Sequence, residues 1–378
     1  MMALGKPQVT AMLEAAGIEV GGGEPWDVHV RDERVYRRMA THGLLGVGEA
    51  YMDGWWDCDR LDRMAERMLL AGAYDALDRS PPAALLRLRS RLWNLDSRRR
   101  AHKVGKHHYD IGNDLYERML DARMVYSCGY WKGLDTRGAG GLDAAQEAKL
   151  DLVCRKLGLE EGMRVLDIGC GWGSFAKFAA ERYGVHVTGL TVSREQRALA
   201  RAWCRGLDVD VRLQDYRAYR PEGPFDRVVS IGMFEHVGHK NHRAFMRAAH
   251  RCLRPRGLML LHTIGTPRSE VSTDPWTHKY IFPNGHLPST AQVGRAADGL
   301  FFLEDVHGFG QFYDPTLMAW HANAETAWDD LPYDERFRRM WRFYLLTAAA
   351  SFRTRRIQLW QFVYARGQGV PGGYEPVR

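Results

Sequence analysis

The sequence lacks several patterns that would assign the chain to particular classes of protein. No apolar run approaches the roughly 20 residues that a membrane-spanning helix needs. The segment at the start of the chain contains a proline and a glutamate and no long apolar stretch, so we expect no secretory signal peptide. The six cysteines include no CxxC pair, which favours free thiols over disulfides or a structural zinc site. These absences predict a globular cytoplasmic protein.

Positive charge, in contrast, is in excess. The chain has 53 Lys and Arg residues against 46 Asp and Glu residues, a net charge of +7, which suggests an anionic partner such as nucleic acid or an acidic membrane surface. The cations gather in one short region around Trp93, mixed with leucines at roughly helical spacing. They are Arg87, Arg89, Arg91, Arg98, Arg99, Arg100, Lys103 and Lys106. Two interpretations stay open: a helix that lies on anionic lipid headgroups, or a solvated helix between domains.

The patterns on the two sides of this basic region differ. Residues 1–79 predict a small unit that has a strand in WDVHV and a helix in RDERVYRRMA. The prolines at 81 and 82 and the basic stretch after them are typical of a linker. We therefore expect one domain over residues 1–100 and a second over residues 101–378.

The second of these domains shows alternating helices and strands. An amphipathic helix begins near Asp143, with Leu150, Val153 and Leu157 on its apolar face. Helical segments then separate the strand-like runs RVLDIG, VHVTGL, DVRLQD, RVVSIG and LMLLHTIG. Continuous apolar strands with helical crossovers predict an α/β fold, in which helices cover both faces of a parallel sheet.

The segment VLDIGCGWGSF, residues 165–175, combines the end of a strand, a GxGxG turn and the start of a helix. Gly169, Gly171 and Gly173 allow positive φ and let a ligand lie against bare backbone. Asp167 precedes the turn, and a carboxylate at this point suits a cationic amino-acid ligand better than a nucleotide diphosphate. S-adenosylmethionine carries both an ammonium and a sulfonium, so it is the cofactor that we predict.

The next two strand ends supply groups that match this cofactor. A nicotinamide-binding fold would usually have Asp or Glu after the second strand to bind the ribose. This sequence has neither there, which leaves ribose recognition to Thr191 or Gln196. We add Ser193 to the predicted site. After the third strand, Asp215 and Tyr216 offer an acceptor and an aromatic face for adenine. Each group alone is more often a turn or a helix cap, but three consecutive strand ends favour a cofactor site.

Longer motifs resemble the cyclopropane-fatty-acyl-phospholipid synthase family. These motifs are HYDIGNDLY, YSCGYW, LDIGCGWGSF, GLTVSREQ, SIGMFEHVGH, LLHTIG, YIFPNGHLPS and IQLWQFVYARG, and they cover most of residues 105–366. The resemblance implies a class I, Rossmann-like methyltransferase with a mostly parallel seven-stranded sheet and a small, mainly helical, lipid-binding N-terminal domain. It also implies transfer of a methylene from S-adenosylmethionine to a cis double bond in membrane phospholipid. Such an enzyme would be peripheral on the inner face of the membrane, and a homodimer is compatible with the resemblance.

The same resemblance implies a base and its binding residues. In the family, a bound bicarbonate removes the proton that is lost when the ring closes. Its holders would be Cys128, Glu235, His262, the backbone of Ile264, and Tyr313. Tyr126 and Ser127 would close over the methionine end of the cofactor. The Glu235 and His262 pair also fits this role on chemical grounds, because a carboxylate can accept from the bicarbonate hydroxyl and an imidazole can donate to its oxygen.

Alternatives remain for the site and for the methyl acceptor. His236, His239 and His242 follow Glu235 at three-residue spacing, but their directions drift around a helix, so we predict no metal and expect capping or surface roles for the last two. The acceptor could instead be a small amine, or the product a methyl-branched fatty acid. A nucleic-acid substrate is disfavoured because the segment after the fourth strand has neither a DPPY-like motif nor a Pro-Cys dipeptide.

Overall fold

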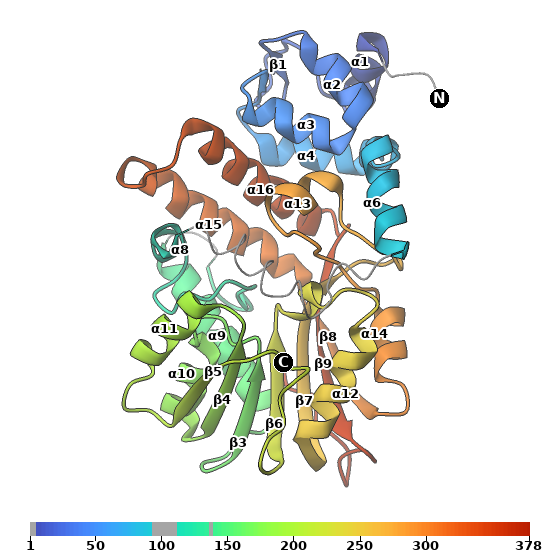
Figure 1. The fold of residues 1–378 in the computed structure, drawn as a ribbon. Helices are drawn as coiled ribbons and strands as arrows, with labels where there is room; N and C mark the ends of the chain where they lie inside the picture. The colour runs from blue at the N-terminus through green and yellow to red at the C-terminus, as the bar shows by residue number, and fades with distance from the viewer. Residues whose placement is uncertain (1–4, 93–111, 136–138) are drawn as a thin grey trace. The chain divides into compact units, whose positions relative to one another are not determined.

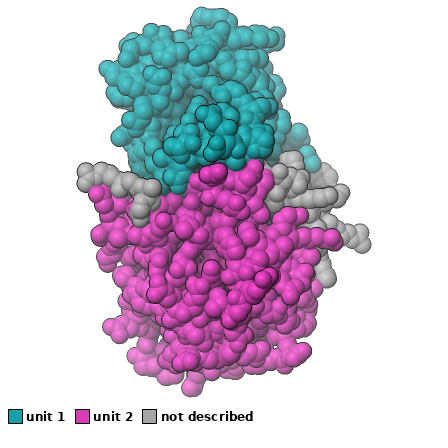
Figure 2. Space-filling view, turned by 90° about the vertical axis from the view of Figure 1, so that its left-hand side faces the viewer, with its two compact units in different colours: residues 1–93, 271–285, 313–357 teal, residues 94–270, 286–312, 358–378 magenta. Residues whose placement is uncertain are grey.

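The computed structural model describes residues 5–92, 112–135 and 139–378 of the 378-residue chain (Figure 1). The chain divides into two compact units, which Figure 2 shows in different colours. The first unit comprises residues 1–93, 271–285 and 313–357, and the second comprises residues 94–270, 286–312 and 358–378. The predicted domain boundary near residue 100 and most of the basic region around Trp93 lie outside the described residues.

The second unit is built on a seven-stranded sheet with the strand order β5-β4-β3-β6-β7-β9-β8. Its strands are β3 (Arg164–Ile168), β4 (His186–Thr191), β5 (Val209–Leu213), β6 (Phe225–Ile231), β7 (Leu253–Gly265), β8 (Phe301–Gly308) and β9 (Gln358–Arg366). Neighbouring strands from β5 to β7 are parallel, and β9 runs antiparallel to both β7 and β8. The prediction of a mostly parallel, seven-stranded sheet is confirmed.

Helices cover both faces of this sheet (Figure 1). The helices of the second unit are α8 (Asn113–Met119), α9 (Ala139–Lys156), α10 (Ser174–Tyr183), α11 (Arg194–Trp203), α12 (His242–Cys252) and α14 (Thr290–Ala297), with the short η1 (Phe234–His236) and η2 (Gly310–Phe312). Successive strand residues point to opposite faces, so Val228 of β6 belongs to the core with α12 and α14, whereas Val229 belongs to the core with α9 and α10. Burial on both faces explains why these strands are continuous apolar runs.

The first unit is mainly helical and is assembled from three separate parts of the chain. Its elements are α1 (Lys6–Ala15), β1 (His29–Val30), α2 (Arg34–His42), α3 (Leu44–Met52), β2 (Trp56–Asp57), α4 (Leu61–Leu70), α5 (Ala73–Leu77), α6 (Pro81–Leu92), α13 (Pro275–Tyr280), α15 (Tyr313–Ala327), η3 (Trp328–Asp330) and α16 (Glu335–Arg353). Helix α16 packs against α3, α4 and α15, and α13 packs against α3. Helices from the second half of the chain therefore complete the fold of the N-terminal helices.

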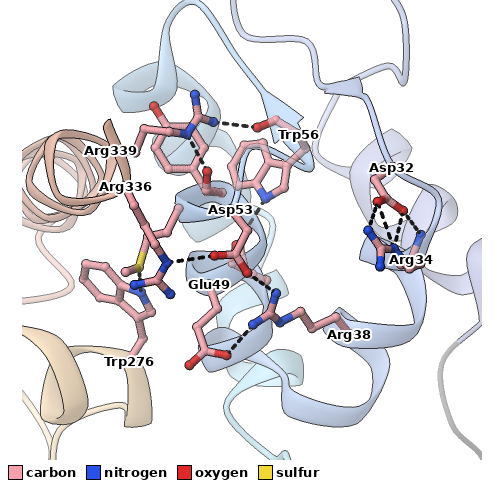
Figure 3. Close-up of polar contacts among 12 residues, drawn as sticks. Asp32, Arg34, Arg38, Glu49, Asp53, Trp56, Trp276, Arg336 and Arg339 are labelled. Atoms are coloured by element: carbon pink, nitrogen blue, oxygen red, sulfur yellow. Dashed lines mark hydrogen bonds and ion pairs between the residues drawn. The ribbon is translucent and has the colours of Figure 1, made fainter. Parts of the chain in front are cut away.

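Ion pairs join these three parts of the first unit. Glu49 of α3 accepts hydrogen bonds from Arg38 at 2.9 Å and from Lys279 of α13 at 2.6 Å. Figure 3 shows Arg38 between Glu49 and Asp53, with Arg336 of α16 on the same Asp53 carboxylate. Because these residues are far apart in the sequence, the pairs specify how the segments meet.

The cysteines and the helices agree with the exclusions made from the sequence. All six cysteines are free and buried, Cys58 in the first unit and the other five in the second, which confirms the predicted thiols. Over residues 5–92, 112–135 and 139–378, each helix is too short or too polar to cross a bilayer.

Candidate active site

The glycine turn joins the end of β3 to the start of α10, as predicted. Gly169, Gly171 and Gly173 have φ angles of 88°, 56° and 87°, a region that residues with a Cβ seldom adopt. A Cβ added to Gly169 would lie 2.5 Å from Cγ of Met233, which precedes η1. The turn therefore requires glycine for its backbone conformation and for its close approach to the Glu235 segment.

Asp167 lies on β3 and is 2% exposed. Its Oδ2 has no hydrogen-bond partner among the described residues. Burial raises the pKa of this carboxyl group to about 7, an effect that the positive charge of Lys149 opposes. A buried carboxylate without a partner costs folding free energy, so its retention is typical of a site that a cationic ligand completes.

The end of β4 brings three predicted cofactor residues into one hydrogen-bond network. The Thr191 hydroxyl donates to Oε1 of Gln196 at 2.9 Å, and the Ser193 N–H donates to Oγ1 of Thr191 at 3.2 Å. Oγ of Ser193 accepts from the backbone N–H of Gln196 at 3.2 Å. Ser193 is therefore the N-cap of α11, and this bond positions Thr191 and Gln196 side by side.

The end of β5 carries the two residues predicted for adenine. The Asp215 carboxylate accepts from the backbone N–H of Arg217 at 2.8 Å and from its guanidinium at 2.7 Å. The ring of Tyr216 meets Phe245 edge to face, with the centroids 5.3 Å apart. Asp215 thus already has a cationic partner, which distinguishes it from Asp167.

The segment of residues 126–128 lies in the second unit and packs against α8 and α9. Tyr126 contacts Tyr116 of α8 edge to face, with the centroids 5.2 Å apart. Oγ of Ser127 accepts a hydrogen bond from Nζ of Lys149 on α9 at 2.9 Å. Cys128 is fully buried. The predicted cofactor-closing residues and the predicted holder Cys128 are therefore consecutive, with Tyr126 held against α8 and Ser127 against α9.

Glu235 lies in η1, directly after β6. Its Oε1 accepts from the backbone N–H of Ile264 at 2.6 Å, whereas its Oε2 is buried with no partner in the described ranges. Burial raises the pKa of this carboxyl group to about 7, and the bond from Ile264 opposes that shift. The structure thus brings two of the predicted anion holders into direct contact.

His262 lies on β7 and is 1% exposed. Its Nδ1 lies 3.2 Å from the amide Nε2 of Gln361, which makes Nδ1 the acceptor and leaves the proton on Nε2. That Nε2 is buried and has no partner in the described part of the chain. Burial lowers the pKa of the imidazole well below its usual value, so the ring is neutral. Ile231, at the end of β6, pairs with His262, so the segment that carries Glu235 begins beside this imidazole.

The fifth predicted holder, Tyr313, belongs to the other compact unit. It begins α15, and its ring stacks on Phe352 of α16 with the centroids 4.3 Å apart. Within the second unit the structure brings Glu235 and Ile264 together, and it places His262 beside the strand that leads to them.

The histidines after Glu235 correct one expectation. His242 is 4% exposed and its ring stacks on Phe234, with the centroids 4.3 Å apart, so the surface role predicted for it is wrong. Its Nε2 is buried and has no hydrogen-bond partner among the described residues. Among the residues that the structure describes, no group of three or more His, Cys, Asp or Glu side chains could hold a metal ion.

Sequence analysis missed the burial of Lys149 on α9. It is 1% exposed, and burial lowers its pKa to about 8. On a helix that reads as amphipathic, a lysine is normally assigned to the solvated face. The available signal was spacing, because Lys149 and the equally buried Lys156 are seven residues apart and so share one helix face.

A mostly parallel seven-stranded sheet with an antiparallel β9, a buried carboxylate on β3 and a glycine turn directly after that strand is the arrangement of class I methyltransferases, which use S-adenosylmethionine. Comparisons with known proteins agree. The family model for mycolic acid cyclopropane synthetase matches residues 96–362. The cyclopropane-fatty-acyl-phospholipid synthase of Escherichia coli (strain K12) is 49% identical over 358 residues, which are 94% of this chain and 92% of that protein.

Two further comparisons agree with this family. Tuberculostearic acid methyltransferase UfaA1 of Mycobacterium tuberculosis (strain ATCC 25618 / H37Rv) is 35% identical over 364 residues, 90% of this chain and 83% of that protein. The crystal structure of mycolic acid cyclopropane synthase CmaA1 complexed with SAH and CTAB has 34% identity and a TM-score of 0.63, and the match covers 70% of this chain and 98% of that one. The chain belongs to the cyclopropane-fatty-acyl-phospholipid synthase family, which confirms the resemblance and the prediction of a methyltransferase.

Proposed function

We propose that this protein forms cyclopropane fatty acids by transferring a methylene to the cis double bond of acyl chains in membrane phospholipids. The observation that carries the proposal is a pair of buried carboxylates. Asp167 and Glu235 each have one oxygen without a partner among the described residues, on the two sides of the Gly169 and Met233 contact. Two such oxygens suit two different groups, a cationic cofactor and a small anion. The name of the Escherichia coli relative supports the choice of acceptor.

The cofactor site would be shared among the ends of β3, β4 and β5. S-adenosylmethionine supplies an electrophilic methyl group when it is bound. The orphaned Oδ2 of Asp167 fits its ammonium group, and the glycine turn leaves backbone uncovered beside it. Thr191 with Gln196 would hold the ribose, and Asp215 with Tyr216 the adenine. Ser193 would contribute indirectly, as the N-cap of α11.

The residues around Glu235 fit a bound bicarbonate. An alkene that attacks a sulfonium methyl becomes a cation, which needs a nearby anion. Bicarbonate would supply that charge and the base for loss of the methyl proton. Glu235 offers an unused acceptor and His262 an unused donor, the two groups that a bicarbonate hydroxyl and oxygen require. Cys128 and the backbone of Ile264 would complete the set within the second unit, with the N–H of Ile264 shared with Glu235, and the role of Tyr313 stays a prediction.

Product analysis tests this function. Phospholipids from cells that express the protein should contain acyl chains that are heavier by one methylene, as judged by mass spectrometry. With methyl-deuterated S-adenosylmethionine, a cyclopropane product keeps two of the three deuteria, and the cyclopropane proton signals in its NMR spectrum distinguish it from a branched chain. Absence of any modified acyl chain, while a control synthase produces it, would show the proposal to be wrong. A methylated amine formed in place of a modified lipid would assign the alternative acceptor.

We also propose that α6 binds the phospholipid surface, which would place the protein peripherally on the inner face of the membrane. Leu85, Leu88 and Leu92 are 57%, 53% and 60% exposed and recur on one face of the helix. Arg89 and Arg91 lie between and beside them. Exposed leucines flanked by cations suit the interface of an anionic bilayer. Assembly into a homodimer stays a prediction.

Vesicle binding tests this surface. L85Q/L88Q should reduce co-sedimentation with phosphatidylglycerol vesicles, whereas L70Q, which changes the 71% exposed Leu70 of α4, should leave it unchanged. Equal binding of wild type and L85Q/L88Q would remove α6 from the membrane contact. Binding to RNA in place of vesicles would assign the positive charge to nucleic acid.

A further inference from the structure

Gln361 is a polar residue in the middle of an apolar strand. It lies on β9 between Trp360 and Phe362, which are both buried, and it is 0% exposed. Among the described residues its side chain makes one hydrogen bond, between Nε2 and Nδ1 of His262 at 3.2 Å, and its Oε1 is buried without a partner. A buried amide with an unsatisfied oxygen costs free energy of folding, so stability does not explain its retention.

The pairing of two strands brings Gln361 to His262. Strands β7 and β9 are antiparallel, and their register places these two residues directly opposite each other. Residues that are directly opposite point to the same face of a sheet, with their Cβ atoms about 5 Å apart. Leu260 and Val363, their neighbours on that face, belong to the same core as Val153 of α9. The amide and the imidazole therefore share the face of the sheet that α9 covers.

The surroundings of His262 keep its imidazole neutral. Burial lowers the pKa of the ring well below its usual value, and the positive charges of Lys149 and Lys156, two buried lysines of α9, add to this effect. A neutral imidazole has a single ring N–H, on either Nδ1 or Nε2. His262 can therefore donate to an anion from Nε2 only if the proton is kept off Nδ1.

The amide of Gln361 supplies this preference. An amide NH₂ group can only donate hydrogen bonds, so the ring nitrogen that accepts from it carries no proton. The hydrogen bond to Nδ1 thus leaves the proton on Nε2, and Nε2 is buried with no partner in the described part of the chain. The one hydrogen bond that the Gln361 side chain makes among these residues is the one that prepares an unused donor.

We propose that Gln361 is a positioning residue, which holds the proton of His262 on Nε2 and so makes this imidazole a donor to the bound bicarbonate. The proposal rests on the assignment of bicarbonate to this site under the proposed function. Gln361 acts through His262 and does not itself touch the anion.

Q361E separates this role from a purely structural one. A carboxylate can only accept, so it would draw the proton to Nδ1 and leave Nε2 without a proton to donate. Its charge would also raise the pKa of His262, so that a second proton returns to Nε2 in acid. The kcat of Q361E on phospholipid vesicles should therefore rise several-fold between about pH 8 and about pH 6 relative to wild type. The same fractional loss at every pH would overturn the proposal.

Q361M is a second variant, of similar volume and without added charge, for the case that Q361E does not fold. Because it removes the donor to Nδ1, the bicarbonate concentration that gives half-maximal activity should increase about tenfold, with unchanged affinity for S-adenosylhomocysteine. Q358M is the matched control, since Gln358 lies on the same strand but on its opposite face, and it should leave both values unchanged. An equal bicarbonate requirement for Q361M and wild type would contradict the proposed role.

NMR spectroscopy can observe the proton directly, without lipid or bicarbonate. In protein labelled with nitrogen-15 at histidine, chemical shifts and couplings distinguish Nε2–H from Nδ1–H, and H262N identifies the signals of His262. Wild type should carry the proton on Nε2, and Q361E should carry it on Nδ1 at alkaline pH. A proton on Nδ1 in wild type would overturn the proposal. Because this measurement needs no turnover, it can succeed even if no cyclopropane product is found, and the two proposals can fail separately.

Discussion

Asp62 in the first compact unit and Asp167 and Glu235 in the second are all buried carboxylates, but they differ in their partners. In the first unit, Asp62 accepts hydrogen bonds from Arg60 and Arg353. Burial alone would raise the pKa of Asp62, but these bonds more than offset that effect. Its pKa therefore lies below the usual value. In the second unit, Asp167 and Glu235 each have an unpartnered oxygen among the described residues, and burial raises both pKa values to about 7. A buried carboxylate that has cationic partners within the chain stabilises the fold. A buried carboxylate that lacks such partners is available to bind a ligand.

Arg353 shows how completely the first unit pairs its charges. Its guanidinium donates to Asp314 at 2.9 Å, to Glu66 at 3.0 Å and to Asp62 at 3.1 Å. These acceptors come from α15 and α4, so one arginine at the end of α16 joins helices from both parts of the sequence. The comparison therefore predicts that substitutions at paired charges such as Arg353 and Asp62 change stability, and that substitutions at Asp167 or Glu235 change ligand binding or turnover.

The largest expected effect is on turnover. E235Q keeps the shape of the side chain but removes the anionic acceptor that would orient the base, so kcat should fall about a hundredfold or more. The affinity for S-adenosylhomocysteine should be unchanged, as measured by calorimetry beside steady-state rates on phospholipid vesicles. A similar loss in kcat and in affinity would assign Glu235 to the cofactor instead.

The next effect is on stability in the first unit. R353M leaves three carboxylates without their common partner, so the free energy of unfolding should decrease by about 3 kcal/mol in urea titrations. R336M is the control, because the Arg336 side chain is 46% exposed and its ion pair with Asp53 should contribute little. If R353M weakened S-adenosylhomocysteine binding without lowering stability, the distinction between the units would be lost.

A smaller effect is expected from the paired substitutions D167N and D62N. D167N should weaken S-adenosylhomocysteine about tenfold and leave the ligand-free protein as stable as wild type or more stable, since an unpaired buried charge is removed. D62N should do the reverse, with lower stability and unchanged affinity. Calorimetry and urea unfolding on the same samples give both readouts, and the same response from both variants would refute the comparison.

The smallest effect is the pH dependence of stability, and its sign should differ between the units. The pKa of Asp167 is raised from 3.8 to about 7, so its contribution to stability is complete at about pH 4 and is lost as the pH rises through about 7. The pKa of Asp62 is lowered, so its contribution is present above 3.8 and is lost as the pH falls through its folded-state value. Relative to wild type, D167N should therefore gain stability between about pH 4 and about pH 7, and D62N should approach wild type in acid. Urea unfolding should be measured across this pH range for wild type, D167N and D62N. The assignment would be contradicted if the stability differences of D167N and D62N from wild type changed in the same direction with pH.

Local patterns were enough to predict the five parallel strands and the glycine turn, whereas the number of seven strands came from the family resemblance. Continuous apolar runs with helical crossovers specify a parallel sheet, and Gly169 and its neighbours need no distant partner to adopt positive φ. The helical first unit was only partly predictable, because Glu49 and Lys279 are 230 residues apart and no local pattern relates them. Burial of polar residues was likewise missed, since hydropathy assigns a lysine such as Lys149 or a histidine such as His242 to the surface.

The six buried thiols can report on the unfolding of each unit separately. An alkylating reagent should leave the native enzyme unlabelled, because each sulfur is enclosed by packed side chains. Cys58 becomes accessible only when the helical unit opens, and the remaining five only when the sheet unit opens. Peptide mass spectrometry after brief alkylation in denaturant would therefore report, from the unmodified natural chain, which half loosens first.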